Sequence, residues 1–201
     1  MSPTLTTPLP TAPLQAAPRA KPARRPATLL LAYGAALNPE HIMVRLCRPK
    51  VRGIARLPHY KLGFHGHSEV WDSGLETLVD EPGAEVWGVL YELSATELDR
   101  FDAWQGVKLD GGGSYFHTPV DVITPDGQAL DALAHRKAEQ GPPQPPSRQY
   151  LDFILAGARA RGLPNDHVER LQAIASVPAR YPVPKINTDI TALASKLSCA
   201  C

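Results

Sequence analysis

The chain has 201 residues, 43% hydrophobic and 20% charged, which is enough apolar material for one ordinary domain that folds without disulfides or structural metal. The formal net charge is +1, but the charged residues among positions 1–28 are all basic, so the remainder is mildly acidic and a nucleic-acid-binding surface is not expected. Three cysteines, an odd number, exclude a multi-bridge secreted scaffold and favour a reducing, cytoplasmic location.

The two ends of the chain are predicted to be tails. Residues 1–28 hold 7 of the 21 prolines and show no apolar periodicity, which is typical of a disordered segment. Residues 177–201 are expected to be peripheral, and the terminal Cys199 and Cys201 offer too few ligands for a zinc site. No apolar run is long enough to cross a membrane. The domain is therefore expected over residues 29–176.

The first half of this domain is predicted to be mainly strands. The run LLLAYG at 29–34 indicates a buried strand, and Asn38 then caps a helix that ends before Pro49. Residues 51–93 have strand-like composition, and the sequence EPGAE at 81–85 is predicted to be a turn between two strands.

The second half is predicted to mix helices and strands. Ser94 and Glu97 match a capping box, which predicts a helix from about Ala95 to Trp104. Residues 114–136 indicate two strands joined by a Pro-Asp-Gly turn, and two helices follow. Because strands and helices do not alternate as βαβ units, the expected class is α+β around a largely antiparallel sheet or barrel.

Four segments resemble, in order, the gamma-glutamylcyclotransferase family, also called AIG2-like. They are LAYGAALNPEHI (31–42), GAEVWGVLYELSATELDRFDAWQGVK (83–108), SYFHTPVDV (114–122) and PPSRQYLDFILAGARARGLPNDHVERLQAI (145–174). Tyr33, Gly34 and Leu37 match the Tyr-Gly-Ser-Asn-Leu signature of the family. The resemblance implies a small, mixed, largely antiparallel β-barrel flanked by helices.

The resemblance also implies an enzyme for a small glutamyl-type amide, with no metal or other cofactor. The charge balance and the lack of a long apolar run predict no nucleic-acid and no membrane partner. In the family reaction the α-amine of the substrate attacks its own side-chain carbonyl and 5-oxoproline forms. The enzyme supplies orientation, a proton acceptor and stabilisation of the oxyanion. The substrate-binding residues that the resemblance implies are Tyr33, Gly34, Ala35, Ala36, Leu37, Trp104, Tyr115 and Tyr150.

The chain departs from the family at its catalytic positions. The Ser-Asn of the signature is Ala35-Ala36, and the catalytic glutamate of the family falls on Gln105, an amide that cannot accept a proton at neutral pH. Glu76 stands where the family has a small apolar residue, and inside the barrel it would suit a relocated acid or base. Strand alternation predicts instead that Glu76 points to solvent. Asp102 is a weaker candidate for the same role.

Two further alternatives remain open from the sequence. His65 and His67, two residues apart on a predicted strand, would lie on one side of it near Glu69, and with His117 they give a weak signal for a metal site. The alternative to an enzyme is a catalytically inactive module that uses the same pocket to bind a small molecule or to serve a regulatory role. The preferred reading is an enzyme with Gln105 and Glu76 at the catalytic positions and no metal. It would carry out either the family reaction with a relocated base or a different acyl or amide reaction in the same pocket.

Overall fold

The computed structural model describes residues 27–46, 49–108, 110 and 112–185, so the predictions for residues 1–26 and for Cys199 and Cys201 lie outside the described residues. In chain order the elements are β1 (Thr28–Ala32), η1 (Ala35–Leu37), α1 (Pro39–Leu46), β2 (Lys50–Ser68), β3 (Ser73–Leu93), α2 (Ala95–Gln105), β4 (Tyr115–Ile123), β5 (Ala129–Lys137), α3 (Arg148–Ala160) and α4 (Asn165–Gln172). None of these helices is long and apolar enough to cross a membrane.

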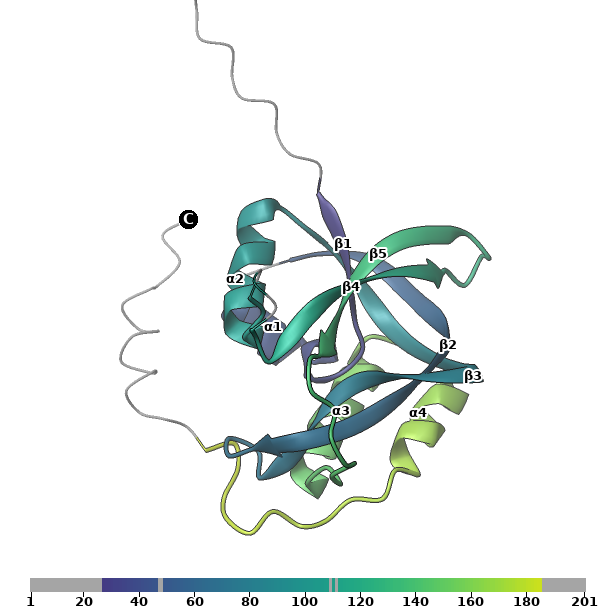
Figure 1. The fold of residues 1–201 in the computed structure, drawn as a ribbon. Coiled ribbons are helices and arrows are strands. Elements are labelled where there is room, and N and C mark those ends of the chain that lie inside the picture. The colour runs from purple at the N-terminus through teal and green to yellow at the C-terminus, as the bar shows by residue number, and fades with distance from the viewer. Residues whose placement is uncertain (1–26, 47–48, 109, 111, 186–201) are drawn as a thin grey trace, which may run out of the picture.

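The five strands form a closed barrel in the order β1-β3-β2-β4-β5, and the helices lie around it (Figure 1). Neighbouring strands are antiparallel except β1 and β5, whose parallel pairing closes the barrel. Closure removes the free sheet edges that would otherwise invite aggregation. The expected fold, a small mixed barrel flanked by helices, is confirmed.

The prediction of a turn at 81–85 is wrong, because β3 runs without interruption from Ser73 to Leu93 against β2. The pairing of the two strands shifts between Pro58 and Tyr60, opposite this segment. Gly83 has a φ of 85° and His59 a φ of 65°, so the positive φ values lie at an irregularity in the ladder. The Pro-Gly sequence therefore distorts a long strand and does not end it.

The apolar core has two parts. One fills the barrel, with Leu57, Leu78 and Val122 fully or almost fully buried. The other lies between the barrel and the helices and includes Phe101 and Ile154. Helix α1 packs on α2, while α3 packs on η1 and α4, so the helices cover the segment that follows β1 (Figure 1).

Two helix caps position residues of the site. The capping box of Ser94 and Glu97 begins α2 as predicted, and the left-handed Gly106 ends the helix directly after Gln105. Ser147 caps α3 by accepting a hydrogen bond from the backbone N–H of Tyr150 at 3.3 Å. Tyr150 therefore lies in the first turn of α3, where the cap fixes the backbone.

Candidate functional site

The turn after β1 binds a carboxylate of the protein itself. The backbone N–H of Ala35 donates a hydrogen bond to Oε1 of Glu76 at 2.9 Å. Gly34 permits this approach, since a Cβ at that position would lie 2.2 Å from Cγ of Glu76. The turn whose residues are predicted to bind substrate thus has an N–H directed at a carboxylate.

Glu76 points into the protein, and the prediction of an outward side chain is wrong. Only 7% of the residue is exposed, and the hydroxyl of Tyr150 donates a hydrogen bond to Oε2. The hydroxyl of Tyr115 donates to the backbone carbonyl of Glu76 at 3.0 Å. Alternation failed here because Thr77 and Leu78, which follow on β3, are also fully buried. Both faces of the strand are covered at this point, so period two does not identify a solvent side.

Three buried tyrosines lie around the carboxylate. Burial raises the pKa of Tyr33, Tyr115 and Tyr150, and the negative charge of Glu76 raises each pKa further. Their hydroxyls therefore stay protonated at neutral pH and act as hydrogen-bond donors. Tyr33 donates to the backbone carbonyl of His135 and so ties the start of the turn to β5.

Two residues that carried no functional signal in the sequence bind backbone carbonyls of the turn. The hydroxyl of Tyr91 donates to the carbonyl of Ala36 at 3.0 Å. Arg161 donates from Nε to the carbonyl of Leu37 at 3.1 Å and from its guanidinium to the Tyr91 hydroxyl at 2.7 Å. An arginine at the C-terminal cap of α3 carried no sequence signal for this role, because its partners lie more than 60 residues away along the chain.

The chain matches known proteins over most of its length. Residues 85–171 match the model of the AIG2-like family. The human gamma-glutamylcyclotransferase is 34% identical over 152 residues, which cover 73% of this chain and 78% of the human protein. The chain belongs to the gamma-glutamylcyclotransferase family. The bovine protein of the same name is 33% identical over 150 residues.

Solved structures agree with this assignment to the gamma-glutamylcyclotransferase family. A structure named gamma-glutamyl cyclotransferase superposes with a TM-score of 0.71 at 32% identity, covering 85% of this chain and 99% of that chain. A second structure, of a human protein, gives a TM-score of 0.72 at 30% identity with the same coverage. The family barrel is thus retained around the altered residues.

Gln105 and Trp104 lie in the last turn of α2, next to the strand that carries Tyr115. Val107, two residues after Gln105, forms an isolated bridge with Tyr115, which brings this end of α2 to the start of β4. Gln105 is partly exposed. Trp104 packs edge-on against His41, with ring centroids 4.5 Å apart, and against the apolar core. A role for either side chain in binding substrate stays a prediction.

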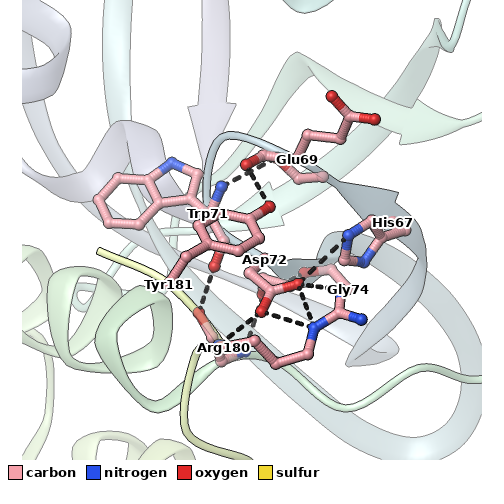
Figure 2. A network of polar contacts seen from close by, with 10 residues as sticks. His67, Glu69, Trp71, Asp72, Gly74, Arg180 and Tyr181 are labelled. Atoms are coloured by element: carbon pink, nitrogen blue, oxygen red, sulfur yellow. Dashed lines mark hydrogen bonds and ion pairs between the residues drawn. The ribbon is translucent and has the colours of Figure 1, made fainter. Parts of the chain in front are cut away.

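The structure separates the histidines that the sequence grouped. His65 is buried and its Nδ1 lies 3.1 Å from the carbonyl of Gly141, whereas His67 is exposed and lies 3.4 Å from Asp72. Figure 2 shows His67 in a polar network where Arg180 binds Asp72 with its guanidinium and its backbone N–H. The predicted pair on one side of the strand is therefore wrong.

His117 is elsewhere, hydrogen-bonded to Asp102 together with His135. Burial acts to raise the pKa of Asp102, but the hydrogen bonds from His135 and His117 outweigh it and hold the pKa below its ordinary value. Asp102 is thus an ionised carboxylate committed to two imidazoles. A role for Asp102 as the relocated base stays the weaker prediction.

Proposed function

We propose that this chain is a gamma-glutamylcyclotransferase that acts on a small gamma-glutamyl amide and uses Glu76 as the proton acceptor that Gln105 cannot be. The observation that carries the proposal is the buried Glu76 carboxylate between the N–H of Ala35 and the hydroxyl of Tyr150. The resemblance implies a catalytic carboxylate at position 105 on α2, where this chain has an amide, while Glu76 brings a carboxylate from β3 to the turn after β1.

The proposed reaction joins two parts of one substrate. The α-ammonium gives a proton to the Glu76 carboxylate, and the free amine attacks the side-chain carbonyl to close a five-membered ring. The carbonyl oxygen gains negative charge in this step. The N–H of Ala35 stabilises the charge once the substrate oxygen has displaced the Glu76 carboxylate from that N–H. The bond to the leaving nitrogen then breaks as Glu76 returns the proton to it. The ring nitrogen loses its remaining extra proton to solvent, and the products are 5-oxoproline and a free amine.

The tyrosines have supporting roles in this scheme. Tyr150 keeps one hydrogen bond to Glu76 when the substrate displaces the carboxylate from Ala35, so the acceptor remains oriented. Tyr115 fixes the backbone at Glu76. Gln105 retains a donor and an acceptor that suit recognition of the substrate, without a proton-transfer role.

A binding module is the second candidate function, and one observation favours it. The Glu76 carboxylate already satisfies the N–H of Ala35, and its Cγ and Oε1 fill the space next to Gly34. While Glu76 stays in this position, the N–H of Ala35 is not free to stabilise an oxyanion, so the turn would lack the catalytic role that the enzyme requires of it.

Product formation separates the two functions. We expect the purified protein to release 5-oxoproline from at least one member of a panel of gamma-glutamyl amines and gamma-glutamyl amino acids. The matched control is the same compound with an acetylated α-amine, which lacks the nucleophile and should give no product. Binding of the panel compounds without 5-oxoproline would refute the enzyme and support the binding module.

A further inference from the structure

A cluster of two histidines and one aspartate lies outside the reaction described above. Asp102 is on α2, His117 on β4 and His135 on β5. The two histidines are direct partners in the antiparallel ladder, so their side chains leave the same face of the barrel. Residues from three elements, 15 to 33 positions apart, thus meet at one point.

The two imidazoles direct the same nitrogen at a single atom. Nε2 of His117 lies 2.9 Å from Oδ1 of Asp102, and Nε2 of His135 lies 2.8 Å from that same oxygen. The rings are stacked, with centroids 5.3 Å apart and planes inclined by 11°. One potential ligand atom from each residue lies within 4.8 Å of the others. This is the only group of three metal-ligating side chains so placed within the described part of the chain.

We propose that Asp102, His117 and His135 bind a divalent transition-metal ion, with Zn²⁺ the best match. Two imidazole nitrogens and one carboxylate oxygen are ligands that suit zinc and its first-row neighbours better than magnesium or calcium. Three protein ligands leave a fourth tetrahedral position for water or another small ligand.

The dimensions of the cluster fit such an ion after a small movement. Ligand atoms at about 2.0 to 2.1 Å from a tetrahedral zinc ion lie roughly 3.3 Å from one another. The measured separations of 2.8 and 2.9 Å from Oδ1 therefore need to open by roughly half an ångström. A rotation of the Asp102 side chain about its own bonds would provide this opening without a change in the pairing of β4 and β5.

The three side chains differ in their exposed fraction, as expected for a metal site with one side open to solvent. The side chains of His135, Asp102 and His117 are 5%, 14% and 25% exposed. His135 is held by stacking on Phe101, with ring centroids 5.2 Å apart, so one ligand is fixed in the core. His117 lies at the open side, where an ion can enter from solvent.

The proposal is tested by Zn²⁺ binding to the full chain, prepared without a histidine tag and treated with a chelator. Calorimetric titration should give one Zn²⁺ per chain. His117→Ala, at the most exposed ligand, should weaken binding about tenfold or more, since even residues that only orient a ligand cost 10- to 100-fold. The matched control is His67→Ala, an exposed histidine also beside an aspartate, which should bind as the wild type does.

Two results would overturn the proposal. They are equal affinity in wild type and His117→Ala, and no saturable Zn²⁺ binding in the wild type. Either result would mean that the three residues only form hydrogen bonds that attach α2 to the barrel. Cys199 and Cys201 are present in every variant, so they cannot cause a difference between them. A circular dichroism spectrum unchanged in His117→Ala shows that a loss of binding does not come from misfolding. The Co²⁺ absorption spectrum should likewise show nitrogen and oxygen ligation that is lost in the same variant.

Discussion

The close packing of Gly34 against Glu76 gives a quantitative test of the site. A Cβ on Gly34 would lie 2.2 Å from Cγ of Glu76 and 2.4 Å from its Oε1, so Gly34→Ala must displace the Glu76 side chain from the turn. Overpacking of this kind costs about 1–3 kcal/mol in the free energy of unfolding. Glu76→Ala should also destabilise, by about 1–3 kcal/mol, because it leaves the N–H of Ala35 and the hydroxyl of Tyr150 without their partner.

The two substitutions together should cost less than the sum of their separate effects. In the double variant the new methyl group enters space that the glutamate has left, so the overpacking term disappears. The expected coupling is about 1–3 kcal/mol, measured by urea unfolding of the wild type, both single variants and the double variant.

Gly88→Ala is the control for this cycle. A Cβ there would lie 2.5 Å from the carbonyl oxygen of Ala32, so the variant is overpacked at a different point of β3. Its cost should add to that of Glu76→Ala within about 0.5 kcal/mol. If Gly34→Ala and Glu76→Ala were also additive within that margin, the placement of Glu76 in the turn would be refuted.

Three other predictions follow from particular side chains. His167 is buried, and neither ring nitrogen has a hydrogen-bond partner among the described residues. Burial lowers the pKa of His167 to about 4, so on acidification the unfolded chain binds the proton before the folded protein does. The free energy of unfolding should therefore fall as the pH drops from about 6.5 to 4. His167→Leu should remove about 3 kcal/mol of this pH dependence in urea unfolding, and an unchanged dependence would contradict it. Hydrogen bonds from Arg180 lower the pKa of Asp72 to about 2, so the ionised Asp72 stabilises the fold above about pH 4 and this effect is lost between about pH 4 and 2. Asp72→Asn should make the free energy of unfolding depend less on pH in that window. An unaltered acid transition would argue against the ion pair of Asp72 and Arg180. Glu76→Ala should abolish 5-oxoproline release, and adding Gln105→Glu should restore part of it by returning the carboxylate to α2; no recovery, with binding intact, would place Gln105 outside the reaction.

The sequence predicted the parts of the fold that depend on local signals or on the family resemblance. The capping box at Ser94 and the barrel itself are confirmed, because the first depends on nearby residues and the second on a match that spans the domain. The orientation of Glu76 was not predictable from alternation, since Thr77 and Leu78, which follow it on β3, are also fully buried. Tyr150 of α3 is the hydrogen-bond partner of Glu76.

The remaining features depend on long-range pairing. His117 and His135 meet Asp102 only because β4 and β5 pair in one particular register and α2 ends beside them. A one-residue slip would send one imidazole to the other face. The sequence therefore could not place the three ligands together, and it gave no sign that Arg161 holds the turn.

The central claim is that Glu76 is the proton acceptor, and the rate of 5-oxoproline release by Glu76→Gln tests it most directly. Glutamine keeps the size of the side chain and one acceptor oxygen for the N–H of Ala35, and its NH2 can donate to the Tyr150 hydroxyl, but it cannot accept a proton. The rate should therefore fall by about 10²- to 10⁴-fold while substrate affinity changes only a few fold. Glu92→Gln, on the same strand but paired with Lys50 at the surface, should retain the wild-type rate. A Glu76→Gln rate equal to that of the wild type would contradict the account.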